Sequence, residues 1–521
     1  KNLLIVKTIG ISDGADIDVK VSSTNNSRSN ANKQQAFELT ENDGFDALFA
    51  VDNRVPNQMG AVINKAGYSL NAGSGATRAA AMTAGNKYRL FLYKKVGATY
   101  EYNNSFEFVA GQEAPVTVDQ GTFKWVALSY NSADNVPVRG ANDNFSLLEN
   151  KDVLYAKSSS DIIIGDVSTP ISIVFDRLFS RIAIELNTEG MFAKMESATV
   201  AITGQSSKSG TIDLKTGDFV GGFSAGVTPG ITYANFVNIN NASRKVAYFY
   251  TADPTSQNIS VTLQNLVIKL DDESTRSFGA TTLQNSLTIS PVRGKSHRFL
   301  VGLTESALTF GGVKWSRSNL YYNVDSTRRY RFNAKNLYSS AVDQNSYFAF
   351  KGHIPRKLAS ALTAQQKDPC ALVYPAQLWK TPTKTDLDAI QNQEGVLGNI
   401  LGAVGELLGV GGTPGASGAN NYIEFTPTAG VNAAYGTATS PENKLRFNYN
   451  GLQTTVDLVE GLIGLNLGTS KGGQAAFWTN TQAVDLLGLV GVGAWNYLGY
   501  TGRNLVGGAV PKGSAGYGLL N

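Results

Sequence analysis

The chain has 521 residues, of which 42% are hydrophobic and 17% charged, and its formal net charge is +4. A chain of this length exceeds what one hydrophobic core supports, so we expect two to four domains. The small net charge and the absence of a Lys/Arg cluster exclude the electrostatic footprint of a nucleic-acid-binding protein. No apolar run reaches the roughly twenty residues that a transmembrane helix needs.

The single cysteine, Cys370, excludes an intramolecular disulfide framework, so stability must come from packing and sheet hydrogen bonds. A weakly charged surface rich in Asn, Ser, Thr and Gly is typical of an extracellular protein that packs against copies or partners. No charged segment followed by an apolar run opens the chain. If the protein is exported, we expect this sequence to begin after processing.

The first residues predict a strand. Leu3, Leu4, Ile5 and Val6 form a short apolar run, and Asp16–Val21 alternates strictly between polar and apolar residues. Further on, Arg78 lies in a stretch of small residues, where a trypsin-like processing protease could cut. The alternative is that this stretch is an ordinary surface linker.

Strand-length runs continue through the first region. Tyr88–Tyr93 reads as a buried strand, Tyr100–Phe108 as a polar hairpin, and Thr122–Tyr130 as a long strand with apolar side chains on both faces. Because Gly/Asn/Asp turns separate them, residues 1–168 are predicted to form a β-sandwich.

The segment Ile171–Asn187 organises the centre of the chain. Ile171, Ile173 and Phe175 mark one buried face, and the apolar residues from Ile182 onward follow the other parity. A buried face changes parity only if an extra residue is accommodated, so a bulge or bend is predicted between Asp176 and Arg181. Further strands predict a second all-β domain over residues 169–308; they are Ala198–Ile202, Gly210–Leu214, Val246–Tyr250, Ile259–Leu270 and His297–Val301.

These segments resemble a known family. Lys87–Leu90, Trp125–Asn131, Asp152–Ala156 and Val174–Leu186 are similar to the fimbrillin-like, type V pilin-related surface proteins of Bacteroidetes. The resemblance implies two tandem transthyretin-like sandwiches, a lipoprotein precursor attached to the outer membrane through a processed lipid anchor, and subunits joined by a donated strand. An incomplete sandwich exposes an apolar groove and unpaired amides, which an extended segment of another copy can satisfy.

Leu3–Val6 is therefore a candidate strand-exchange segment. The alternative is that it is an ordinary first strand of its own domain. Tyr517–Asn521 is short and does not alternate, which departs from the pattern of a stalk subunit that donates its terminal segment.

The sequence pattern changes in residues 309–521, where the first credible helix of the chain is predicted. Thr381 followed by Pro382 predicts a helix N-cap and first position, and Leu387 and Ile390 share one face of the helix. Together with Trp315, the Trp379–Thr383 element and Phe477–Asn480, this order resembles C-type-lectin-like modules related to the Fibrobacter succinogenes major paralogous domain. The resemblance implies an α+β fold in which Trp478 and Asn480 face a ligand. The first triplet of the calcium-type sugar site is missing, so the resemblance implies no calcium or other cofactor.

Three apolar, glycine-interrupted segments lie in this region, at residues 396–411, 458–468 and 484–493. Each glycine weakens an isolated helix by about 1 kcal/mol, so these segments need tertiary or intersubunit contacts. They either pack on their own domain or form a contact face for another subunit.

No enzyme is expected. Gly468–Gly472 matches the nucleophile-elbow pattern, but both histidines, His297 and His353, precede it, whereas that arrangement needs the histidine later in the chain. The sequence therefore predicts a structural or adhesive subunit of an extracellular, cell-surface fimbria, which assembles by strand donation with other pilus subunits or copies of itself and displays a lectin-like head. The alternative is a non-polymeric surface lipoprotein that binds glycans or host surface proteins.

Overall fold

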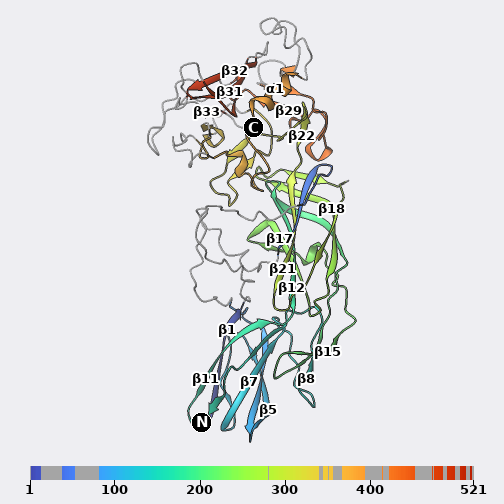
Figure 1. The fold of residues 1–521 in the computed structure, drawn as a ribbon, viewed down its shortest axis with the longest axis vertical. Coiled ribbons are helices and arrows are strands. Elements are labelled where there is room, and N and C mark those ends of the chain that lie inside the picture. Colours follow the sequence, from blue (N-terminus) through green and yellow to red (C-terminus); the bar gives the residue numbers. More distant parts are fainter. Residues whose placement is uncertain are drawn as a thin grey trace.

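The computed structural model is an elongated, mainly β protein (Figure 1). The residues that the structure describes are 2–12, 38–52, 81–279, 281–338, 344–349, 351–355, 367–392, 413–414, 422–451, 472, 474–484, 490–498, 505–511 and 517–518. The predicted Asp16–Val21 strand and the segments at residues 396–411 and 458–468 lie outside them. Within the described part of the chain, no helix is long and apolar enough to cross a membrane.

An eight-stranded sheet lies at the lower end in Figure 1. In order it contains β5 (Thr99–Val109), β4 (Lys87–Val96), β7 (Gly121–Ser129), β9 (Leu154–Lys157), β11 (Thr169–Arg177), β1 (Leu3–Ser12) and β6 (Val116–Thr117), with β10 (Ile162–Ile164) beside β7. One face carries a hydrophobic core that includes Leu90 and Phe175. The other face packs through Phe91 and Val126 on a small sheet of β15 (Phe219–Phe223), β14 (Gly210–Asp213) and β8 (Asn144–Ser146). This two-sided packing explains why the predicted β7 strand is apolar on both faces.

The predicted break in the central segment is confirmed. β11 ends at Arg177, a bend follows, and β12 begins at Ser180 in a different sheet. That sheet contains β16 (Val237–Ile239), β17 (Asn241–Thr251), β12 (Ser180–Gly190), β21 (Ser296–Glu305), β3 (Phe45–Asp52) and β2 (Glu38–Thr40). The change of parity therefore marks the point where the chain leaves one sheet for another.

A further sheet completes the second sandwich. It contains β13 (Ala193–Thr203), β18 (Gln257–Leu270), β19 (Thr275–Phe278) and β20 (Leu283–Ile289). Apolar residues of both sheets share one core, for example Phe45, Ile184 and Phe299 from the first and Ile259 and Phe278 from the second. The alternating buried side chains of β18 are those expected of a strand with one face on a core.

Sheet pairing crosses the boundary drawn at residue 168 in both directions. β3, which lies in the first 168 residues, pairs with β21 over eight residues, from Phe45 with Glu305 to Asp52 with Arg298. β11, which follows residue 168, pairs with β9 and β1. The domain ranges themselves stay predictions.

The C-terminal region holds short sheets and one α-helix among its described residues. Its strands are β22 (Leu308–Phe310) with β23 (Val313–Trp315), β24 (Leu320–Tyr322) with β25 (Tyr330–Phe332), β26 (Phe348–Ala349) with β33 (Tyr517–Gly518), β27 (Thr413–Pro414) with β28 (Tyr422–Phe425) and β29 (Leu445–Asn448), and β30 (Gln474–Val484) with β31 (Val490–Leu498) and β32 (Leu505–Pro511). The helix α1 spans Lys384–Asn392.

The helix was correctly predicted, but its N-cap was wrong. Thr383, not Thr381, caps α1, since its Oγ1 accepts from the Asp386 N–H at 3.1 Å while its own N–H donates to Asp386 Oδ2 at 2.8 Å. This reciprocal pair is a capping box. Thr381 instead binds Asp368 through its N–H and hydroxyl, at 2.8 and 2.7 Å. Leu387 and Ile390, which were predicted to share one face of the helix, are both buried.

Candidate functional site

β1 is held along one edge by a parallel neighbour. Leu4 to Ser12 pair with Thr169 to Asp176 of β11, with a register shift between Thr8 and Gly10. On the other edge only Leu3 and Leu4 pair with a strand, the two-residue β6. In the described part of the chain, no strand therefore pairs with the second edge of β1 from Ile5 onward.

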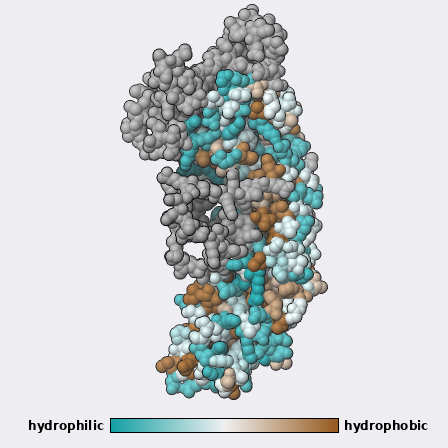
Figure 2. Space-filling view, viewed as in Figure 1, coloured by the Kyte–Doolittle hydropathy of each residue, from teal (hydrophilic) through white to brown (hydrophobic). Residues whose placement is uncertain are grey.

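Alternate side chains anchor β1 in the core of the first sheet. Leu4, Val6 and Ile11 are buried, whereas Ile5 and Ile9 are 39% and 46% exposed. Full burial of three aliphatic side chains contributes on the order of 5 kcal/mol. Figure 2 shows hydrophobic surface at the edge of the molecule where β1 runs in Figure 1. β1 thus fills an apolar slot, and it also exposes apolar side chains.

One polar contact fixes the open edge of β1. Thr8 donates to Glu113 Oε1 from its hydroxyl at 2.7 Å and from its N–H at 3.4 Å. Burial raises the pKa of Glu113, but hydrogen bonds from Thr8 and from the backbone N–H groups of Glu113 and Gly111 together outweigh it, so the pKa of this carboxyl is lowered. The Glu113 carboxylate therefore lies beside Thr8, at the position on this edge where a neighbouring strand would otherwise form backbone hydrogen bonds with β1.

The sequence-predicted site residues lie in different places. Leu3, Leu4, Ile5 and Val6 are in β1. Arg78 lies outside the described residues. Trp478 is 2% exposed, and its Nε1–H donates to the Phe348 carbonyl at 2.8 Å, so its indole lies in the core of the C-terminal region. Asn480 is exposed, and its backbone N–H donates to the Pro382 carbonyl at 2.8 Å.

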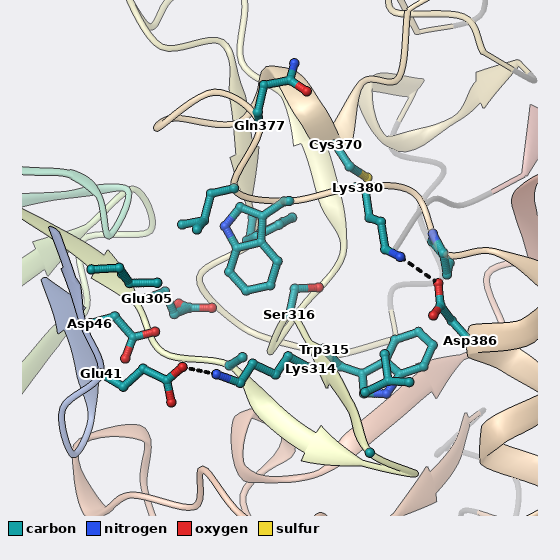
Figure 3. Close-up of a pocket in the computed structure, with 18 residues that line it drawn as sticks. Glu41, Asp46, Glu305, Lys314, Trp315, Ser316, Cys370, Gln377, Lys380 and Asp386 are labelled. Atoms are coloured by element: carbon teal, nitrogen blue, oxygen red, sulfur yellow. Dashed lines mark hydrogen bonds and ion pairs between the residues drawn. The ribbon is translucent and has the colours of Figure 1, made fainter. Parts of the chain in front are cut away.

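A second feature, the junction cavity, lies where the second sandwich meets the C-terminal region. Its volume is about 450 Å³, within the range of small-molecule sites. Figure 3 shows Glu41, Asp46 and Glu305 on one side, and Lys380 with Asp386 on the opposite side. The full lining is Leu39, Glu41, Asp46, Glu305, Ala307, Gly312, Val313, Lys314, Trp315, Ser316, Phe332, Cys370, Gln377, Leu378, Trp379, Lys380, Pro382 and Asp386.

Both lysines of the junction cavity are paired with carboxylates. Lys314 binds Glu41, and Lys380 Nζ lies 3.3 Å from Asp386 Oδ2. Asp46 is left to accept from the Asn42 N–H at 3.3 Å, and burial raises its pKa to about 6. Desolvation of a carboxylate with few donors is the cause of such a rise. One wall of the cavity is therefore acidic and poorly solvated.

Sequence reasoning missed this cavity because its walls come from segments hundreds of residues apart. The acidic wall comes from β3, the residues after β2 and the end of β21, whereas the opposite wall comes from the first turn of α1 and the loop before it. The one available signal was the Trp379–Thr383 element, which marked this loop as distinctive. Nothing in the sequence indicated that β2 and β3 would join the second sandwich.

No protein-family model matches the chain. No curated protein matches it either. Among solved structures, the chain is similar to a candidate cell adhesion protein of Bacteroides fragilis (14% identity over 43% of this chain and 85% of that one, TM-score 0.28). It is also similar to one from Bacteroides ovatus (13% identity, 44% and 90%, TM-score 0.27) and to the fimbrial anchor protein Mfa2 from Porphyromonas gingivalis (11% identity, 36% and 73%, TM-score 0.21).

Proposed function

We propose that this chain is a non-enzymatic subunit of a bacterial cell-surface fimbria, in which the slot filled by β1 is the site of strand exchange between subunits. The observation that carries the proposal is the pairing of β1, which has a parallel neighbour on one edge and almost none on the other. To leave, β1 has to break its parallel pairing with β11 and the two-residue contact with β6, and no other strand pairing of the described residues.

The chemistry of the slot fits an exchangeable strand. The slot accepts Leu4 and Val6 in alternation and Ile11 after the register shift between Thr8 and Gly10, and it offers the backbone groups of β11 for pairing. An extended segment of another copy with the same alternation would satisfy both. The parallel pair is slightly less stable per residue than an antiparallel pair, which favours replacement.

The remaining architecture belongs to the same proposal. The two tandem sandwiches would be transthyretin-like stalk modules, and the C-terminal region would be a C-type-lectin-like head presented at one end of the elongated molecule (Figure 1). The protein would be extracellular and attached to the outer membrane through a lipid anchor. Its partners would be other subunits or copies of itself.

A peptide-exchange experiment tests the proposal. A specific protease site is inserted between Ser12 and Glu38 of the full chain, and the protein is cut there. We expect the cut protein to take up a fluorescent peptide of residues 1–12, followed by anisotropy, because the peptide recreates the buried aliphatic contacts. A matched peptide with Leu4→Asp and Val6→Asp should not bind, because burying unpaired carboxylates is costly.

Assembly is then followed by electron microscopy of the cut protein at high concentration. Filaments or short chains of subunits that disappear when excess peptide 1–12 is added support strand exchange. If the cut protein takes up no peptide and stays monomeric, the proposal is wrong.

The second candidate is a non-polymeric surface protein that binds glycans or a host protein. The junction cavity is the observation that favours it, because assembly by strand exchange needs no small-molecule cavity. Monomers in the electron microscope together with ligand binding would select this function.

A further inference from the structure

The junction cavity contains a buried charged group that the fold leaves incompletely satisfied. Glu305 is 4% exposed, and its Oε2 accepts from Arg276 Nη1 at 3.0 Å, whereas its buried Oε1 has no hydrogen-bond partner. Figure 3 shows the Glu305 carboxylate on the same side as Asp46, facing the interior of the cavity. Buried polar atoms are nearly always paired, and an unpaired carboxylate oxygen carries a desolvation penalty.

A second unsatisfied group in the lining is a donor. The indole Nε1 of Trp379 is buried and has no hydrogen-bond partner. The ring itself is held in place by an edge-to-face contact with Phe332, at 5.0 Å between centroids and 88° between planes. The cavity wall thus combines an unpaired acceptor, an unpaired donor and a fixed aromatic surface.

The two unpaired groups discriminate between classes of ligand. An ammonium group could satisfy Glu305 but offers no acceptor to Trp379, since it carries only donors. An anion could accept from Trp379, but Asp46 and Glu305 would repel it. A metal ion is not favoured either, because no group of three or more potential ligands occurs among the described side chains.

A hydroxyl group both donates and accepts, so neighbouring hydroxyls of one neutral ring can satisfy both groups. The apolar face of such a ring can lie on the aromatic and aliphatic side chains of the lining, which include Phe332, Leu378 and Trp379. We propose that the junction cavity is a saccharide-binding site, in which Glu305 and Asp46 accept from ring hydroxyls and Trp379 Nε1–H donates to one.

The electrostatics agree with a neutral ligand that donates. Lys314 and Lys380 are already paired with Glu41 and Asp386, so an anionic ligand would have to break an ion pair to gain one. Asp46 accepts from the Asn42 N–H, and burial raises its pKa to about 6. Hydroxyl donors from a bound sugar would stabilise its ionised form and lower that pKa. This inference does not depend on strand exchange, and it assigns the site that a surface binding function would use.

The test uses the full-length protein and a panel of neutral probes, namely glucose, galactose, mannose, N-acetylglucosamine and their β-linked disaccharides. Binding is detected by saturation-transfer NMR and titrated by tryptophan fluorescence. Nα-acetyl-lysine methylamide serves as the ammonium probe and inorganic phosphate as the anionic probe. We expect saturable binding of at least one sugar and of neither charged probe.

Three variants locate the site. Trp379→Phe keeps the ring and removes only the unpaired N–H, so it should weaken binding about five- to tenfold, as expected for one hydrogen bond. Asp46→Asn and Glu305→Gln should each weaken it about tenfold or more, because hydrogen bonds to charged groups are stronger. Trp125→Phe, on β7 in the other sandwich, is the matched control and should bind as the wild type does.

Thermal unfolding of each variant separates loss of binding from loss of fold, and Trp379→Phe breaks no hydrogen bond in the structure. The proposal is overturned if no sugar of the panel binds. It is also overturned if sugar binding is unchanged in Trp379→Phe and Asp46→Asn, or if only the ammonium probe binds.

Discussion

The strongest structural prediction concerns Arg317, which joins the second sandwich to the C-terminal region. Its side chain is 1% exposed, and the guanidinium lies 3.6 Å from the ring centroid of Tyr435. Its donors reach the Ser306 carbonyl (2.8 Å) and hydroxyl (2.9 Å), the Glu442 carbonyl (2.9 Å), Asn443 Oδ1 (3.3 Å) and the Gly430 carbonyl (2.5 Å). Arg317 therefore connects the end of β21 to two loops of the C-terminal region.

Arg317→Met keeps much of the side-chain length and removes every donor. The acceptors left behind are buried, and each unpaired one costs about 1–3 kcal/mol, while a desolvated cation–π contact is worth about 2 kcal/mol. These contributions overlap and water can enter, so we expect a net loss of about 3–5 kcal/mol, at the upper end of single-residue effects. Arg317→Lys keeps the charge but not the planar guanidinium with its fixed donors, so its free energy of unfolding should fall by nearly as much.

The assay is urea unfolding combined with hydrogen exchange at residues 430–443, because a protein with several domains need not unfold in one step. With a denaturant slope of about 1–3 kcal/mol per molar urea, the midpoint of the affected transition should fall by roughly 1–3 M. Arg293→Met is the control, since its side chain is 41% exposed and its ion pair with Asp218 measures 3.8 Å. An Arg317→Met midpoint within error of that control would refute the reasoning.

Three further predictions follow from single groups. Asp46→Asn should become more stable relative to the wild type as the pH rises from 4 to 7. Burial raises the folded-state pKa of Asp46 to about 6, so the folded state binds this proton more tightly than the unfolded state, and wild-type stability falls through this window. Thermal melting of both proteins across the pH range measures the difference, and parallel curves would contradict it. Cys370 should resist iodoacetamide at pH 8 until the protein is unfolded, since it is buried and burial raises the pKa of its thiol. Mass spectrometry after labelling of the folded protein measures the modified fraction, and rapid modification would contradict this prediction. Leu4→Asp should release β1 and make residues 1–12 sensitive to protease, because it places a carboxylate in the core. Ile5→Asp lies on the exposed face and should not have this effect. Equal cleavage of the two variants would show that β1 is not held by its buried face.

Local periodicity predicted much of the β structure. Strand-length apolar runs identified β4, β7, β17 and β18. The parity change identified the bend before Ser180, because a buried face can change parity only where the chain accommodates an extra residue or bends. The residue preferences of helix starts predicted α1 but assigned its N-cap to Thr381 instead of Thr383. Thr381 and Thr383 both lie just before the helix, and only the fold decides which of them binds Asp368 and which caps α1.

What periodicity could not predict is which sheet each strand joins. β3 reads as a mixed strand near the start of the chain, and nothing in it indicates a partner such as β21, about 250 residues later. The junction cavity and the Arg317 network share this limitation, since their members meet only after long-range pairing is set. Arg317 in particular has no sequence signal, because its acceptors are mostly backbone carbonyls.

The placement of β3 has a consequence for proteolysis. β2 and β3 precede Arg78 in the chain, yet β3 lies inside the second sheet between β21 and β2, and Asp46 belongs to the cavity wall. A nick after Arg78 would therefore yield a two-chain particle whose light chain, carrying β1 to β3, remains bound without a covalent link. Such a particle would migrate as one species in gel filtration and as two bands under denaturing conditions. Only a nick before Glu38 would detach β1 alone and leave the second sandwich covalently whole.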